Sequence, residues 1–458
     1  MEKVAPPTLE RPAEGARRLR RVLSLRDLVF YGIVLIQPIA PVGIFGLSQK
    51  LSDGHVSTTI VLAMVAMLCT AFSYGRMAAL YPSAGSAYTY VARGIHPYLG
   101  FLAGWAMSLD YLIIPIINTI YIALTIRRLL PAVPYVVWVA VFAALISVLN
   151  LRGIRLAARF NTVLLTVMCV VIAIFVALAI RYVALVAGWH GLFSFQPFYD
   201  RKTFHLSSLS TATSLAALTY IGFDGVTTLA EDVEDPRRNL LRATVLVCLI
   251  TGIFSTIEVY LAQRVWPDYH TFRNLETAFL DVTRQVGGAP LFQAMAFILV
   301  LACFGSGLTG QLGAARLLFG MGRDGVLPRG WFAYLDKRSN PSINICLIGM
   351  LAFVGSLFLS YERAAEILNF GAFLAFMGVN IASLRTHCFG LKSSRRRRLL
   401  QDAIVPGLGF LFCLAIWLRL PAPTRIAGGA WLLLGVIVAG VRTSGFRKEL
   451  AAVSLGDS

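Results

Sequence analysis

Long apolar runs, each about 20 residues in length, recur along the whole chain and alternate with short polar segments. A helix rises about 1.5 Å per residue, so a run of this length matches a hydrocarbon core about 30 Å thick. Strands of a membrane barrel would instead show shorter segments of alternating polarity. The pattern therefore predicts an all-α membrane protein. About twelve spans can be drawn, at residues 27–49, 57–80, 97–125, 134–151, 160–182, 207–231, 240–264, 289–317, 343–360, 364–387, 403–420 and 424–442.

Two of these runs, the first and the sixth, are interrupted near the middle. The first contains Gln37-Pro38-Ile39-Ala40-Pro41-Val42-Gly43, in which two prolines remove backbone donors and obstruct the preceding turns. The sixth contains Tyr220-Ile221-Gly222-Phe223-Asp224-Gly225, in which two glycines flank an acid. Interrupted spans five helices apart are typical of transporters built from inverted repeats, whose binding site lies at the breaks.

Composition agrees with a membrane protein and gives it an orientation. Charged residues make up only 14% of the 458 positions, against about 25% in a typical soluble domain. The formal net charge is +18, and most Lys and Arg residues fall in alternate polar segments. The positive-inside rule then places these segments and both termini in the cytoplasm. We expect a multi-pass protein of the cell (inner) membrane, surrounded by lipid and with no nucleic-acid partner.

Three acidic residues lie inside predicted spans: Asp110 in the third, Asp224 at the break of the sixth, and Glu258 in the seventh. Acids within a membrane are costly and mark functional sites by default. A pair of them would complement an alkylammonium substrate. The alternative for Asp224 is a structural role, in which it caps the half-helix that restarts after the break. The aromatic candidates for contact with the substrate are Tyr111, Tyr220 and Phe223.

The polar segments on the cytoplasmic side carry the most specific motifs. These are residues 72–77 (FSYGRM), 81–91 (YPSAGSAYTYV), 231–239 (EDVEDPRRN) and 315–328 (ARLLFGMGRDGVLP), together with 100–105 (GFLAGW) and Asn340-Pro341. In this order, and over about residues 24 to 440, the chain resembles the amino acid–polyamine–organocation (APC) transporters.

The resemblance implies a LeuT-type fold with a five-plus-five inverted repeat, in which helices 1 and 6 are discontinuous. The first repeat would occupy residues 26–206 and the second 207–388, followed by two further helices in 389–443. Cytoplasmic tails would occupy 1–25 and 444–458. The resemblance also implies secondary transport by alternating access, without hydrolysis of a nucleotide. The sequence contains no Gly-x-x-x-x-Gly-Lys-Ser/Thr run that would bind phosphate.

The choice of substrate depends on smaller features. Residues 109–115, 220–224 and 262–268 are most similar to putrescine-importer-type members. Amino acid carriers of this family usually hold the substrate carboxylate with amides of a Gly-x-Gly-Ile-Phe stretch in helix 1, but here Pro41 has no N–H to donate. This favours a polyamine or another small cationic amine, with cationic or neutral amino acids, moved by symport or exchange, as the alternative. The expected substrate-binding residues are Pro38, Ile39, Ala40, Pro41, Gly43, Asp110, Tyr111, Tyr220, Ile221, Gly222, Phe223 and Asp224.

Coupling to an ion has several candidates. Ser306 and Thr309 in the eighth run could supply hydroxyl oxygens to Na⁺, while Asp110 or Glu258 could carry H⁺. Some proton-coupled relatives use a lysine in helix 5, where this chain has Met168. Exchange of one amine for another needs no coupling ion. The charges expected at a cytoplasmic gate, or as simple solvated helix-end charges, are Asp27, Glu231, Arg323 and Asp324.

Other functional classes fit the sequence less well. The six histidines lie in loops or at span ends, without an HExxH motif, and the seven cysteines are scattered without metal-ligand spacing. We therefore expect no enzyme activity, no catalytic residue, no metal site and no cofactor. A channel would need a continuous polar stripe, which no span shows. A sensor would often carry an appended soluble domain.

Overall fold

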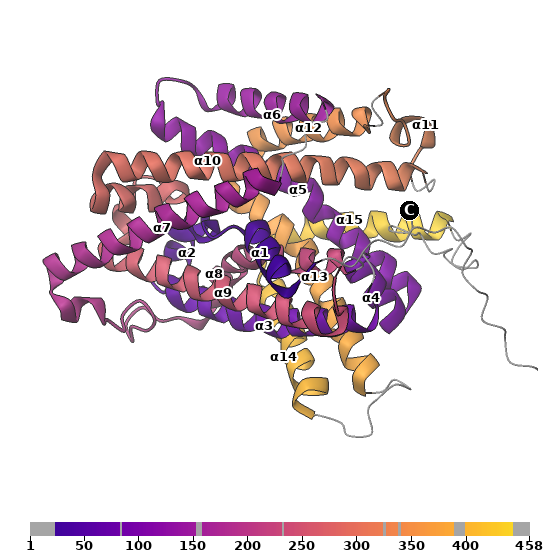
Figure 1. Cartoon of the computed structure of the whole chain (residues 1–458), viewed down its shortest axis with the longest axis horizontal. Helices are drawn as coiled ribbons and strands as arrows, with labels where there is room; N and C mark the ends of the chain where they lie inside the picture. Colours follow the sequence, from indigo (N-terminus) through magenta and orange to yellow (C-terminus); the bar gives the residue numbers. More distant parts are fainter. Residues whose placement is uncertain are drawn as a thin grey trace, which may run out of the picture.

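The computed structural model describes residues 23–82, 85–152, 158–230, 233–323, 327–337, 340–388 and 399–442. Over these ranges the chain is helical, and its β pairing is limited to one isolated bridge between Leu23 and Val233. Most of the long helices run side by side along the long axis of the molecule (Figure 1). The predicted all-α architecture is therefore confirmed.

Nine helices in the described part of the chain are long and apolar enough to cross a membrane. They are α3 (Val56–Leu80), α5 (Pro97–Leu129), α6 (Tyr135–Arg152), α7 (Ala158–Ala187), α9 (Pro236–Val265), α10 (Ala278–Arg323), α13 (Tyr361–Cys388), α14 (Val405–Leu418) taken together with the π-helical segment η6 (Leu400–Ile404) that leads into it, and α15 (Ala422–Arg442). The bent pair α1 (Leu25–Ile36) and α2 (Ala40–Leu51) forms a tenth span if it is counted as one. At 343–360, α12 (Ser342–Phe358) is apolar but has only 17 residues. The chain is a multi-span protein, and the count of twelve stays a prediction.

The first predicted interruption separates α1 from α2, whose axes differ by 49°. Gln37 ends α1 with a φ of 68°, outside the helical region. Pro38 follows and has no N–H to continue the helix. Pro41 lies in the first turn of α2, where a missing N–H leaves no intrahelical bond unmade. The two prolines therefore act at different places, one after the end of α1 and one at the start of α2.

The sixth predicted run is also discontinuous. It begins as α8 (Leu206–Ala216), tightens into the 3₁₀ segment η2 (Ala217–Tyr220), and resumes after a turn as η3 (Phe223–Leu229). Gly222, in the turn, has a φ of 117°, a conformation that glycine adopts without a steric penalty. The glycine noted in the sequence is thus what allows the chain to turn within the run.

The two breaks lie against each other inside the bundle. α1 packs on η3 and α9, and α2 packs on α8. On the other side, α5 contacts α10, α13, α12 and α6, while the short α4 (Ser86–Gly94) packs across α5 and α13. α14 and α15 pack on the outside of α13. The irregular backbone is consequently enclosed by helices, as backbone without regular hydrogen bonds must be within a membrane.

The two ends of the bundle can be told apart. α1 and α9 both begin next to the bridge between Leu23 and Val233, which marks the proximal end. α11 (Arg329–Phe332) and α15 lie toward the right of Figure 1. α2, α7 and α9 end at the distal end, where the long connection between α7 and α8 lies, on the left of Figure 1.

Candidate functional site

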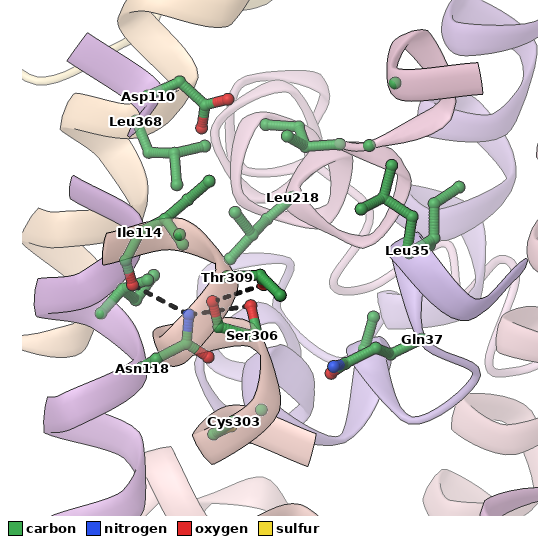
Figure 2. A pocket seen from close by; sticks show the side chains of 18 of the residues that line it. Leu35, Gln37, Asp110, Ile114, Asn118, Leu218, Cys303, Ser306, Thr309 and Leu368 are labelled. Atoms are coloured by element: carbon green, nitrogen blue, oxygen red, sulfur yellow. Dashed lines mark hydrogen bonds between the residues drawn. The ribbon is translucent and has the colours of Figure 1, made fainter. Parts of the chain in front are cut away.

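A cavity of about 330 Å³, the central cavity, lies between the two breaks and helices α5, α10 and α13 (Figure 2). Its size falls within the range of pockets that bind small molecules. Most of the residues expected from the sequence line it. These are Ile39, Ala40, Gly43, Asp110, Tyr111, Ile221, Gly222, Asp224, Ser306 and Thr309.

Two aromatic candidates are placed elsewhere by the structure. Tyr220 is completely buried, and its hydroxyl donates to the carbonyl of Ile60 at 2.9 Å. Phe223 is also completely buried, with its ring centroid 5.4 Å from that of Tyr74 and 5.2 Å from that of Phe376. Both side chains therefore pack the break against α3 and α13 instead of lining the cavity.

Three further candidates also lie outside the lining. Pro38 and Pro41 are buried and shape the break, as described above, while their neighbours Ile39 and Ala40 line the cavity. Glu258 is on α9 and is 1% exposed. Neither of its carboxyl oxygens has a hydrogen-bond partner among the described residues. Glu258 is thus a buried acid apart from the central cavity.

Two carboxyl groups dominate the polarity of the central cavity. Asp110, on α5, is 5% exposed, and its Oδ1 has no hydrogen-bond partner in the described part of the chain. Asp224, in η3, is 7% exposed, and backbone N–H groups of the break interact with its carboxyl. The two carboxyl groups also interact electrostatically with each other. The described lining contains no Lys, Arg or His, so no basic side chain in it pairs with the two carboxyl groups.

Polar side chains that the sequence interpretation missed complete the lining. Asn118 donates through Nδ2 to the carbonyl of Ile114 at 2.8 Å and to Oγ of Ser306 at 3.1 Å (Figure 2). Gln37 donates through Nε2 to the carbonyl of Ala302 at 3.0 Å. Asn118 lies about two helical turns after Asp110, on the same face of α5, and this spacing is a signal that could have found it.

Ser306 and Thr309, whose hydroxyl groups are the candidate ligands for an ion, make different hydrogen bonds. Ser306 accepts the hydrogen bond of Asn118, while Thr309 Oγ1 donates to the carbonyls of Gly305 and Ser306, each at 3.1 Å. Both side chains line the cavity, from adjacent turns of α10. No group of three or more His, Cys, Asp or Glu residues in the described chain could hold a metal ion.

A pair of tyrosines closes one end of the central cavity. The ring centroids of Tyr121 and Tyr361 are 5.0 Å apart, and both residues are buried. Gly43 lies against them, since a Cβ built on it would be 2.7 Å from Oη of Tyr361. Tyr361 is far from the breaks in the sequence, so no local pattern could have linked it to this site.

The opposite side of the central cavity is open. Tyr31 and Leu35, on α1, line the cavity and are 38% and 41% exposed, and Tyr111 on α5 is 38% exposed. Tyr31 and Leu35 come before Gly43 along the chain, and Tyr111 comes before Tyr121 along α5. The exposed residues therefore lie nearer the start of these helices than the tyrosine pair does. The cavity therefore opens toward the proximal end of the bundle and is closed toward the distal end.

The residues expected at a gate are only partly within the structure. Asp27 is exposed and belongs to the capping box of α1, in which its Oδ2 accepts from the hydroxyl of Ser24 at 2.7 Å. Glu231 and Asp324 lie outside the described residues, as does the side chain of Arg323. The gating role of these four residues stays a prediction.

The backbone of the second break can be tested by adding one methyl group. Gly222→Ala would force a side-chain-bearing residue to a φ of 117°, at a cost of at least about 1–2 kcal/mol. We expect its apparent melting temperature in detergent to fall by roughly 2 °C or more. Gly429→Ala is the control, because a Cβ there meets nothing within 4 Å. Equal melting temperatures for the two variants would mean that the break does not need glycine.

Comparison with known proteins adds to this geometry. The family model described as amino acid permease matches residues 33–418. The chain is 33% identical to the low-affinity putrescine importer PlaP of Escherichia coli, over 96% of this chain and 97% of the importer. It is 24% identical to the branched-chain amino acid permease BcaP of Bacillus subtilis, over 93% of each chain. It is 26% identical to the vacuolar cationic amino acid transporter 4 of Arabidopsis thaliana, over 81% of this chain and 64% of that protein.

Proposed function

Because the chain belongs to the amino acid permease family, within the APC superfamily, we propose that it is a secondary transporter for a diamine or another small cationic amine. Its relatives are transporters and not enzymes, as the sequence suggested. The observation that carries the choice of substrate is the central cavity, which presents two buried carboxyl groups and, in its described lining, no basic side chain.

In this proposal each end of a diamine is bound by a carboxyl group. Asp110 accepts one ammonium group through Oδ1, which has no donor of its own in the described chain. Asp224 accepts the other with oxygen lone pairs that its backbone N–H contacts leave free. Tyr31, Tyr111 and Tyr361 offer aromatic surface to the alkyl chain and to the charges. An ammonium group gains more from such pairs than a neutral group, since charge-assisted hydrogen bonds are the strong ones.

The fold proposed for this activity is the LeuT-type arrangement with twelve helices. The breaks at Pro38 and Gly222, and the way α1 packs against η3, support it. Alternating access would then exchange the present opening at Tyr31 and Leu35 for one between Tyr121 and Tyr361. With both termini cytoplasmic in the cell (inner) membrane, the present opening faces the cytoplasm.

Cationic or neutral amino acids are the second candidate substrates. The names of the Bacillus and Arabidopsis relatives favour them, and Gly43 and Ile221 keep backbone N–H groups near the cavity. Two features disfavour amino acids as substrates. Pro41 has no N–H to donate to a carboxylate, and the described lining contains no Lys, Arg or His. A substrate carboxylate would therefore lie near two acids without a basic partner.

Uptake into proteoliposomes tests the proposed function. Purified protein should take up radiolabelled putrescine in a saturable way, faster than protein-free vesicles, and unlabelled diamines should compete. Unlabelled leucine should not compete at the same concentration. Saturable uptake of leucine or arginine, with none of putrescine, would replace the amine proposal by the amino acid alternative.

Proton coupling through Glu258 is the favoured coupling proposal, because a buried carboxyl without a hydrogen-bond partner in the described chain is held in its protonated form and would release the proton only when a conformational change brings it to water or to a partner. Glu258→Gln keeps the size of the side chain but cannot ionise. We expect it to lower accumulation driven by a pH gradient by about tenfold or more, while exchange of internal for external substrate continues. Undiminished pH-driven accumulation would remove Glu258 from coupling.

Sodium coupling through Ser306 and Thr309 gives a different result. In that case Na⁺ would stimulate uptake in wild type and in Glu258→Gln alike, and the double change Ser306→Ala with Thr309→Ala would abolish the stimulation. The proton test and the sodium test use the same proteoliposomes, and in each the direction of the H⁺ or the Na⁺ gradient is reversed as a control.

A further inference from the structure

A second cavity, of about 120 Å³, lies at the distal end of the bundle, and we call it the distal cavity. Three segments form it: the connection between α2 and α3, residues 196–203 between α7 and α8, and the end of α9 with the residues that follow. It is linked to the central cavity by α2. Gly43, near the start of α2, lines the central cavity, and Asp53, just beyond its end, lines the distal one.

One wall of the distal cavity holds a buried acceptor that has no donor. Gln263, on α9, is 5% exposed, and its Nε2 donates to the carbonyl of Gly54. Its Oε1 is buried and has no hydrogen-bond partner among the described residues. A buried acceptor without a donor costs about 1–3 kcal/mol, so a ligand that brings an N–H group would remove this penalty.

Two acidic and two basic side chains line the distal cavity. Asp53 and Asp200 line it, and both interact electrostatically with His55, which is 1% exposed. Burial lowers the pKa of His55, although the two carboxylates and the backbone of Gln196 oppose this shift. Arg264 also lines the cavity, but its Nε donates to a backbone carbonyl outside the lining, at 2.9 Å.

Helix ends place partial charges of both signs at the distal cavity. It lies beyond the C-terminal ends of α2 and α9, where helix dipoles place partial negative charge, and beside the start of α3, where they place partial positive charge. The acidic and imidazole side chains are nevertheless not grouped as metal ligands anywhere in the described chain. A cation that is larger than a metal ion, and that donates hydrogen bonds, matches this spread of acceptors better.

We propose that the distal cavity is a second binding site, which takes the ammonium end of a small amine before the amine reaches the central cavity. The ammonium group lies between Asp53 and Asp200 and donates to Oε1 of Gln263. The choice of an amine rests on the proposed function, while the site itself rests on the residues of the distal cavity. Conformational change at α2 then affects both sites, because the helix contributes to one and ends at the other.

Equilibrium binding of radiolabelled putrescine to the purified full-length protein tests this site. At constant ionic strength, wild type should bind two molecules per chain, in two classes of affinity. The double change Asp53→Asn with Asp200→Asn should remove one class and leave the other, whose survival also shows that the variant is folded. Asn keeps the hydrogen bond that Oδ1 of Asp200 accepts from the N–H of Lys202 at 2.9 Å, and it tolerates the φ of 50° at position 53.

Asp268→Asn is the matched control. Asp268 also accepts from an N–H two residues later, that of His270 at 3.0 Å, and it is exposed next to the distal cavity without lining it. If general surface charge attracted the amine, this variant would weaken binding as much as the change at Asp200. We expect it to keep both classes of site.

The binding experiment can disprove the proposed central site and the proposed distal site independently of each other. Asp224→Asn should remove the class that survives in the Asp53/Asp200 variant and keep the other. If the protein transports no amine but the Asp53/Asp200 variant loses bound putrescine, the distal site stands and the proposed function falls. If the Asp53/Asp200 variant still binds two putrescine molecules, or loses no more than the Asp268 control, the distal site is wrong.

Discussion

Replacing Asp224 with Asn is expected to lower the ratio kcat/KM for putrescine uptake by at least about 100-fold. The side chain keeps its size and can still accept from the backbone N–H groups of the break, but it loses the charge that we propose pairs with an ammonium group. Removing one partner of a buried, hydrogen-bonded charge pair costs about 2–5 kcal/mol. Since about 1.4 kcal/mol corresponds to a factor of ten, a loss of 100-fold lies within that range.

This substitution separates the two roles considered for Asp224. If the residue only caps the half-helix, Asn can do the same, because it is an equally good capping residue. Transport would then be nearly unchanged, and Asp224 would not be in contact with the ammonium group. Initial rates in proteoliposomes with equal amounts of reconstituted protein give the ratio, with Asp268→Asn as the control for lost surface charge.

The second large effect is expected at Gly43, where the closed end of the central cavity leaves no room for a side chain. A Cβ on Gly43 would lie 2.7 Å from Oη of Tyr361 and 3.2 Å from Cζ of Tyr121, and both tyrosines are buried. Gly43→Ala must therefore displace the pair that closes the cavity. We expect the maximal rate of uptake to fall by about tenfold or more, since small misplacements in a binding site have effects of this order.

The cause of this loss can be verified by removing the atom in conflict. Tyr361→Phe deletes the hydroxyl that the new Cβ would meet, so the double variant Gly43→Ala with Tyr361→Phe should regain part of the lost rate. Gly429→Ala, on α15, controls for a methyl group placed where nothing lies within 4 Å. A double variant no faster than Gly43→Ala alone would show that the contact with Tyr361 is not the obstacle.

The features that could be predicted from the sequence were those with local causes. The break between α1 and α2 follows from Pro38 and Pro41, whose missing N–H groups act on the nearest turns. The break at Gly222 follows from a conformation that other residues rarely adopt. Asp110 and Asp224 were identified because an acid inside an apolar run is costly wherever it occurs.

The features that could not be predicted depend on contacts between distant parts of the chain. Tyr121 and Tyr361 meet only because α5 and α13 pack together, and nothing near either residue indicates this. Proximity in sequence was also misleading for Tyr220 and Phe223, which adjoin the break but point into the core. Their partners, such as Tyr74 and Phe376, come from other helices and decide which side of the chain faces the cavity.

The central claim is that the site binds ammonium groups and has no place for a carboxylate. Putrescine and ornithine test it most directly, because ornithine is putrescine with one added carboxylate. Their inhibition constants against radiolabelled putrescine uptake, measured on the same proteoliposomes, should differ by at least about 100-fold in favour of putrescine, or about 2.8 kcal/mol. Ornithine inhibition as strong as that of putrescine, or stronger, would contradict the account and assign the cavity to amino acids.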